Sequence, residues 1–169
     1  MDRHQQALTK LIRDLIELDP ICSVIAIGSI GRGDYRPESD MDINVVTWRC
    51  QEIPRQLPWD LSQEIVHWDG VRLDEGYVDG IKTHLNCSTP TNYQGLIMRG
   101  RVWRWGESRV LHDPSGIAEW GERCIRQFFA DNPQIAGQCR QHHDEYLRHK
   151  KDRSSPYAFQ DTRRVRSES

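Results

Sequence analysis

The sequence has no long apolar stretch, and its apolar content is low. Apolar residue types make up 37% of the 169 residues, and no run approaches the roughly 20 apolar residues that a helix needs to cross a membrane. The opening residues, MDRHQQ, show no basic segment followed by an apolar one, which is the pattern of a secretory signal. These absences predict a cytoplasmic protein without a membrane partner.

Paired cysteines are also missing. The chain has five cysteines, an odd number, and no two of them form a C-x-x-C pair. This pattern argues against a disulfide scaffold and against a structural zinc site. We interpret the cysteines as reduced thiols that serve mostly as small core residues.

The chain has no large excess of charge of either sign. Lys and Arg number 23 and Asp and Glu number 25, which gives a formal net charge of −2 at pH 7. Global charge therefore does not favour binding to nucleic acid or to anionic membranes, although a local charged patch remains compatible with this value.

Hydrophobic periodicity predicts alternating helices and strands in the first half of the chain. Apolar residues recur at helical spacing over 5–18, and Asp19-Pro20 ends this helix because the residue before a proline avoids helical geometry. Short apolar runs at 23–27 and 42–47 predict buried strands. The segment 59–66 is interpreted as a short helix.

The next segment has the pattern of a β-hairpin. Asp79-Gly80 separates two strand-like runs, 71–78 and 81–87, and this dipeptide is a strong signal for a tight hairpin turn. A further helix is predicted to begin within 92–105.

The C-terminal part is predicted to be helical and then unstructured. A turn at 113–116 precedes predicted helices at 117–129 and 134–151. The last residues hold many charged and few apolar side chains, so we expect 152–169 to be disordered. The predicted division is a main domain over 1–115, a helical extension over 116–151 and a tail over 152–169.

Residues 28–42, GSIGRGDYRPESDMD, contain the features of a phosphate-binding turn. Gly28 follows a predicted strand and lets a phosphate approach the backbone, and the Ser29 hydroxyl can bind phosphate oxygens. Arg32 adds a guanidinium group whose planar fork suits phosphate. We therefore predict that Gly28, Ser29 and Arg32 bind a nucleotide.

Two carboxylates follow at the start of the next predicted strand. Asp40 and Asp42 are two residues apart, and such residues point to the same side of a strand. Neighbouring carboxylates repel each other unless a cation lies between them. Mg²⁺ prefers such oxygen ligands and bridges carboxylates to substrate phosphates. The pattern predicts metal-assisted phosphoryl or nucleotidyl transfer.

Gly-Ser, then ten intervening residues, then Asp-x-Asp, between two strands, resembles the nucleotidyltransferase superfamily that includes DNA polymerase β. The form Gly-Ser-x-x-Arg-Gly-Asp with a later Ser-Asp-x-Asp is most similar to the small bacterial members, the minimal nucleotidyltransferases and aminoglycoside adenylyltransferase-like proteins. The resemblance covers residues 5–115. It implies an α+β fold with a small mixed or antiparallel sheet flanked by helices, followed here by a short C-terminal helical extension.

The resemblance also implies an activity and a third carboxylate. The activity is transfer of a nucleoside monophosphate, AMP from ATP or the equivalent from another nucleoside triphosphate, to an acceptor hydroxyl at a two-metal Mg²⁺ site. Asp74, in the first hairpin arm, is the favoured third acid. The implied catalytic and metal-binding set is then Asp40, Asp42 and Asp74. The alternatives are Glu75, which points to the opposite face, His84, on the second arm, and the absence of a third acid.

Three functions are compatible with this resemblance. The first is the enzyme, whose acceptor would be a small molecule, a protein or an RNA end. The second is an antitoxin-like partner of a helical toxin, because small members of this family occur in bacterial toxin–antitoxin pairs. The third is a nucleotide-binding member without transfer activity. Since little chain follows the turn at 113–116, a second copy, a helical partner protein or a longer version of the chain would complete the acceptor site.

Overall fold

The computed structural model describes residues 1–63, 70–98 and 108–151. Its helices are α1 (Arg3–Leu18), α2 (Gly28–Arg32), α3 (Ile53–Gln56), α4 (Pro90–Met98), α5 (Ile117–Asp131) and α6 (Pro133–Lys151). Its strands are β1 (Ser23–Ile27), β2 (Met41–Val46), β3 (Asp60–Gln63), β4 (Arg72–Val78), β5 (Ile81–Ser88) and β6 (Arg109–His112). No helix among the described residues is both long enough and apolar enough to span a membrane.

The chain divides into two compact units, and the division falls inside α5. The first unit is Met1–Gln127 and the second is Phe128–Ser169. The first unit contains the whole sheet and every candidate site residue. The second contains the end of α5 and all of α6, and the tail expected to be disordered lies outside the described residues.

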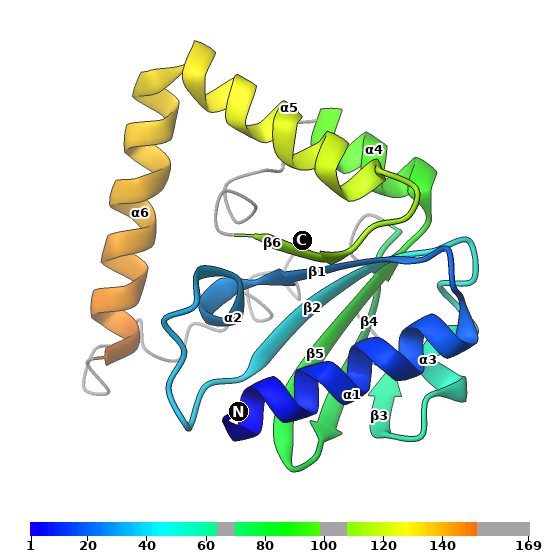
Figure 1. Ribbon diagram of the computed structural model, residues 1–169. Coiled ribbons are helices and arrows are strands. Elements are labelled where there is room, and N and C mark those ends of the chain that lie inside the picture. The colour runs from blue at the N-terminus through cyan, green and yellow to red at the C-terminus, as the bar shows by residue number, and fades with distance from the viewer. Residues whose placement is uncertain (64–69, 99–107, 152–169) are drawn as a thin grey trace, which may run out of the picture. The chain divides into compact units, whose positions relative to one another are not determined.

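The strands of the first unit form one mixed sheet in the order β3-β4-β5-β2-β1-β6 (Figure 1). The central pair, β2 and β5, is parallel, and all the other described neighbours are antiparallel. This architecture confirms the expectation of an α+β fold with a mixed sheet flanked by helices. The parallel pairing places the first residues of β2 beside Thr83 and His84 of β5.

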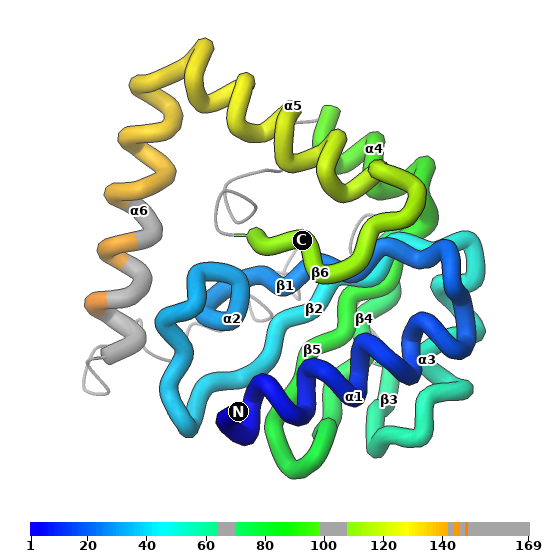
Figure 2. Tube along the Cα trace, in the orientation of Figure 1, coloured from blue at the N-terminus to red at the C-terminus, as the bar shows by residue number. Residues whose placement is uncertain are grey.

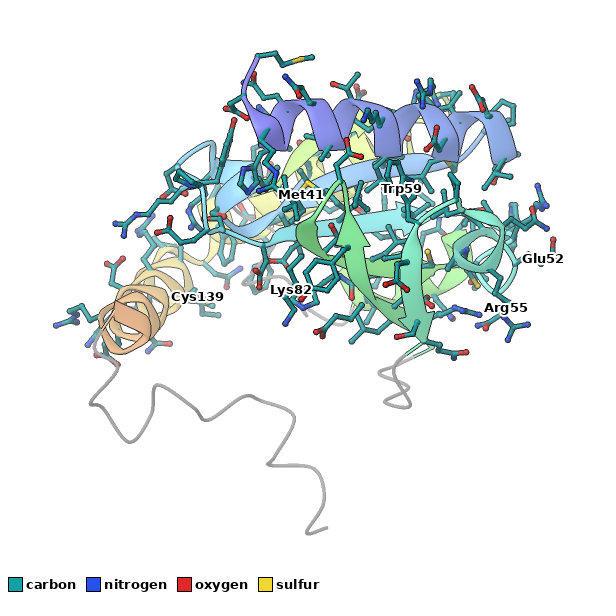
Figure 3. All side chains as sticks on the ribbon, turned by 90° about the horizontal axis from the view of Figure 1, so that it is seen from below. Met41, Glu52, Arg55, Trp59, Lys82 and Cys139 are labelled. Carbon is teal, nitrogen blue, oxygen red and sulfur yellow. The ribbon has the colours of Figure 1, made fainter. Side chains whose placement is uncertain are left out.

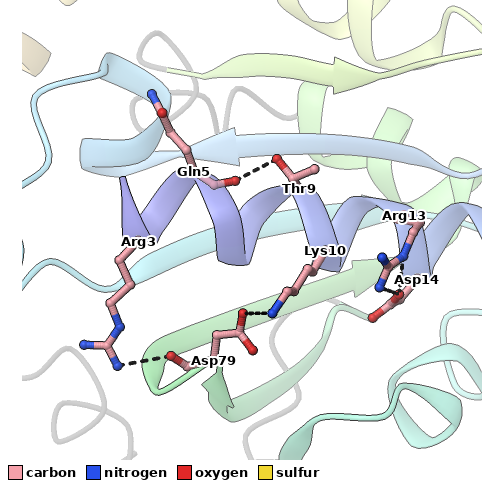
Figure 4. A network of polar contacts seen from close by, with 7 residues as sticks. All are labelled: Arg3, Gln5, Thr9, Lys10, Arg13, Asp14 and Asp79. Atoms are coloured by element: carbon pink, nitrogen blue, oxygen red, sulfur yellow. Dashed lines mark hydrogen bonds and ion pairs between the residues drawn. The ribbon is translucent and has the colours of Figure 1, made fainter. Parts of the chain in front are cut away.

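Helix α1 forms where the periodicity predicts it and covers one face of the sheet. Its N-terminus is closed by a capping box, in which the Asp2 carboxylate accepts a hydrogen bond from the Gln5 amide at 2.9 Å. The helix runs beside the β4–β5 hairpin (Figure 2). At the hairpin turn, Arg3 donates to the Asp79 carbonyl and Lys10 pairs with the Asp79 carboxylate (Figure 4). These exposed contacts orient the helix along the hairpin.

The hairpin of β4 and β5 has the predicted turn. Asp79 and Gly80 have φ angles of 49° and 73°, as a type I′ turn requires. Val78 pairs with Ile81 immediately beside the turn. The turn fixes the register of the whole pair, and with it the position of every side chain on β5 opposite β4.

The two faces of the sheet differ in chemistry. The face under α1 is apolar and includes Met41, Ile43 and Leu85, all fully buried. Residues on the other face of β2, β5 and β4 are largely polar. Figure 3 shows this division, with Met41 on the side of α1 and Lys82 on the side away from it. The start of β2 therefore carries its polar side chains on the face opposite α1.

One predicted element is wrong, and two short elements were missed besides the short helix α2, which stands where the sequence predicts a turn. Residues 60–63 form the edge strand β3 instead of part of a helix over 59–66. The reason is tertiary: Gly76 on β4 lets the Asp60 carbonyl approach so closely that an added Cβ would lie 1.8 Å from it. The missed elements, α3 and β6, have only four residues each, which is too short for a periodic pattern.

Candidate active site

The end of β1 and the start of β2 lie side by side. Ile27 pairs with Asp42 across the antiparallel ladder, and Gly28 follows with a φ of 63°. A Cβ atom at Gly28 would lie 3.0 Å from Asp42 Oδ2. Only glycine adopts this backbone conformation at little cost and leaves the carboxylate oxygen uncovered. The two ends of the predicted motif, Gly28 and Asp42, are therefore adjacent in space.

The glycine-serine segment is a short helix rather than a simple turn. Helix α2 runs from Gly28 to Arg32, and its C-cap residue, Gly33, has a left-handed conformation. Ser29 is partly buried in the first turn. Arg32 is 23% exposed and its Nε lies 3.1 Å from Asp34 Oδ1. The guanidinium is thus paired with a mostly exposed carboxylate through Nε.

Of the two aspartates, one lies on strand β2 and the other lies just before it. Strand β2 begins at Met41, so Asp42 is on the strand and Asp40 immediately precedes it. The Asp42 side chain is 39% exposed, and Asp40 is partly exposed. Met41, between them, points into the core. Both acids therefore lie at the surface where β2 begins.

Asp42 contacts a histidine on the neighbouring parallel strand. His84 is its cross-strand partner on β5, and His84 Nδ1 lies 2.8 Å from Asp42 Oδ1. On the other side of the ring, Nε2 lies 3.3 Å from Glu75 Oε2. This second contact is an ion pair without hydrogen-bond geometry. Glu75 is also paired with Lys82, whose Nζ lies 2.8 Å from Oε1.

The strand pairing explains why these side chains meet. Asp42 on β2 is paired with His84 on β5, which is paired in turn with Glu75 on β4. Paired residues point to the same face of a sheet. We call the row of Asp42, His84 and Glu75 the carboxylate–histidine row. It is an alternation of acid, imidazole and acid across three strands.

The acids around His84 favour its charged form. The hydrogen bond to Asp42 is the largest influence and raises the pKa of His84 above its ordinary value of 6.5. Burial opposes this shift, while the charges of Asp42, Glu75 and Asp40 reinforce it. The Asp40 carboxylate therefore lies close enough to the His84 ring for its charge to raise the pKa of the imidazole.

Asp74, the third carboxylate expected from the sequence, does not lie in this group. Its side chain is 2% exposed, and Arg72 holds it with two contacts, Nε to Oδ2 at 2.7 Å and Nη2 to Oδ1 at 2.8 Å. Arg72 also donates to the Gln51 carbonyl at 2.9 Å. Successive residues on a strand point to opposite faces, so Asp74 lies on the core face and Glu75 on the face of the row.

The two carboxylates, Asp40 and Asp42, suit one divalent cation better than two. Asp40 and Asp42 supply the hard carboxylate oxygens that Mg²⁺ prefers, and Gly28 leaves Asp42 Oδ2 uncovered. Imidazole is a poor ligand for this ion, and one oxygen of Asp42 already faces His84. In the described part of the chain, no group of three or more His, Cys, Asp or Glu side chains is arranged to hold a metal ion.

A separate hollow lies away from these residues. Its volume is about 400 Å³, and its lining includes Trp48, Gln94 and Trp120. Trp48 follows the far end of β2, whereas Asp42 lies near the beginning of that strand. The hollow therefore does not belong to the site of Gly28 and Asp42.

Residues 8–75 match the family model of the nucleotidyltransferase domain. The match runs from α1 into β4 and includes the whole segment from Gly28 to Asp42, so it supports the resemblance to this superfamily that these residues carry. No curated protein sequence matches the chain.

Several solved structures share part of this fold at low identity. The chain aligns with the Cid1 poly(U) polymerase at 16% identity and a TM-score of 0.41, covering 56% of this chain and 32% of that one. It aligns with a CCA-adding enzyme in complex with CTP at 17% identity and a TM-score of 0.41, covering 79% of this chain and 37% of that one. The chain thus spans about a third of the length of these structures.

Proposed function

We propose that this nucleotidyltransferase domain transfers AMP from ATP, in the presence of Mg²⁺, to an acceptor hydroxyl. The observation that carries the proposal is the contact between Gly28 and Asp42, which joins a position open to close phosphate approach to a carboxylate that can hold a cation. The family match over this segment supports the same reaction class.

The proposed roles follow from the chemistry of each side chain. Gly28 and Ser29 would hold the β- and γ-phosphates, and the Arg32 guanidinium, which contacts Asp34 through Nε, would contact them as well. Asp40 and Asp42 would hold Mg²⁺, which when bound neutralises charge on the triphosphate. The set omits Asp74, because Arg72 holds both of its oxygens.

The proposed reaction is a displacement at the α-phosphorus. The acceptor oxygen forms a bond to this phosphorus as the bond to the bridging oxygen of the β-phosphate breaks. The products are the adenylylated acceptor, pyrophosphate and one proton. The positions of Gly28 and Ser29 suit binding of the two phosphates that leave together.

One observation favours a second candidate, nucleotide binding without transfer. Asp42 Oδ1 is engaged by His84, and Asp74 is withdrawn into the core face. A site with two acids can still bind a triphosphate through a cation. Glu75, the alternative third acid, lies on the same face, but His84 stands between it and Asp42 and Lys82 pairs with it.

Differently labelled ATP separates the two candidates. The protein is incubated with Mg²⁺ and ATP labelled on either the α- or the γ-phosphate, together with an aminoglycoside, a protein or an RNA acceptor. The proposal predicts that one acceptor gains the α-label and that the γ-label is released as pyrophosphate. Mg²⁺-dependent binding of ATP with no labelled acceptor and no pyrophosphate would support the second candidate instead.

A further inference from the structure

His84 holds the Asp42 carboxylate in one orientation. Its Nδ1 lies 2.8 Å from Asp42 Oδ1, while Oδ2 of the same carboxylate lies 3.0 Å from the point that a Cβ atom at Gly28 would occupy. Without this contact, a carboxylate that is 39% exposed would be free to rotate. The imidazole therefore leaves Oδ2 directed toward the glycine, on the side where a phosphate would approach.

Glu75 lies against the other ring nitrogen in an ion pair without hydrogen-bond geometry. Its Oε2 lies 3.3 Å from His84 Nε2, and its Oε1 is paired with Lys82 Nζ at 2.8 Å. His84 and Glu75 are only 18% and 24% exposed, so both lie mostly inside the sheet surface. The ring is thus contacted at both nitrogens, by one acid from each neighbouring strand.

We propose that His84 is a positioning residue, supported by Glu75, that fixes Asp42 so that Oδ2 is presented to a divalent cation beside Gly28. The inference rests on the proposed function, because it assigns Asp42 to cation binding. Residues that orient a metal ligand commonly contribute about 10–100-fold to metal affinity. A contact that only stabilised the fold would leave the cation affinity unchanged.

The first test measures cation binding directly. Mn²⁺ is titrated into the full chain, and free Mn²⁺ is followed by electron paramagnetic resonance. His84→Leu is expected to weaken Mn²⁺ binding by about 10–100-fold. His84→Asn keeps an N–H group near the position of Nδ1 and is expected to recover most of the affinity. His112→Asn is the matched control, because His112 contacts the Pro20 carbonyl at the far end of β1.

A second arm tests the role of Glu75. Glu75→Gln is expected to weaken Mn²⁺ binding several-fold in the wild-type background and to have no further effect together with His84→Leu, because the two residues act in series. Thermal unfolding of each variant is recorded beside the titration. His84→Asn provides the decisive comparison if His84→Leu does not fold.

The outcomes separate this inference from the proposed function. Equal Mn²⁺ affinity in wild type, His84→Leu and His84→Asn would overturn the positioning role, even if the wild type adenylylates an acceptor. Additive losses for His84→Leu and Glu75→Gln would overturn the support from Glu75. Weakened Mn²⁺ binding in His84→Leu that is recovered in His84→Asn upholds the positioning role, even if no acceptor is labelled.

Discussion

Replacing Asp42 by asparagine is expected to lower the rate of AMP transfer by roughly 10²–10³-fold, the usual effect of removing one group that stabilises developing charge in an active site. Asparagine has the same size and can still accept a hydrogen bond from His84. The strand pairing with Ile27 uses only the backbone. The substitution therefore removes the negative charge beside Gly28 and leaves the fold intact.

The measurement is the initial rate of α-label transfer at saturating ATP and Mg²⁺. Asp60→Asn is the matched control, because Asp60 is an exposed carboxylate on the edge strand β3. We expect this control to keep wild-type activity. An Asp42→Asn enzyme with activity within a few-fold of wild type would remove Asp42 from the catalytic set.

Replacing Asp74 by alanine is expected to lower the free energy of unfolding by about 3–5 kcal/mol, because it leaves a buried guanidinium without its partner. Both side chains are almost fully buried, at 3% exposed for Arg72 and 2% for Asp74. The short, two-contact ion pair also raises the pKa of Arg72, so the guanidinium remains charged. Urea unfolding followed by circular dichroism measures the loss.

A double substitution distinguishes a structural Asp74 from a catalytic one. Arg72→Met with Asp74→Leu removes both charges, and apolar replacement of a buried pair is often neutral or stabilising. We expect the double variant to be more stable than Asp74→Ala and to retain transfer activity. An Asp74→Ala protein with wild-type stability and no activity would return Asp74 to the role expected from the sequence.

The spacing within residues 28–42 predicted the main geometry of the site because its determinants are local. A buried strand that ends at Gly28 and another that begins near Asp42 must lie close together when a short segment connects them. The same holds for the hairpin, whose turn residues Asp79 and Gly80 set the register of two strands. In both cases, residues near each other in the chain determine the contact.

The choice between Asp74 and Glu75 could not be made in this way. The sequence shows that the two point to opposite faces, but not which face is buried. That depends on Arg72 beside Asp74 and on the distant pairing of β4 with β5. The sequence did hold one signal for a buried Asp74. Arg72 lies two positions before it, so both side chains share a face and can form an ion pair there.

The contact between His84 and Asp42 depends on a longer-range feature. It exists because β5 lies parallel to β2, although the two residues are 42 positions apart in the chain. Hydrophobic alternation places His84 on the polar face of its strand, but periodicity does not reveal which strand will be its neighbour. The edge strand β3 was missed for the same reason, since its structure comes from pairing with β4.

Mg²⁺-dependent binding of a non-hydrolysable ATP analogue, measured by isothermal titration calorimetry, tests most directly whether Gly28 and Asp42 form a triphosphate site. We predict that the wild-type chain binds the analogue with Mg²⁺ and not with EDTA. Gly28→Ala should abolish this binding, because its Cβ would lie 3.0 Å from Asp42 Oδ2 at a φ of 63°. Equal binding with and without Mg²⁺, or unchanged binding by Gly28→Ala, would contradict the account.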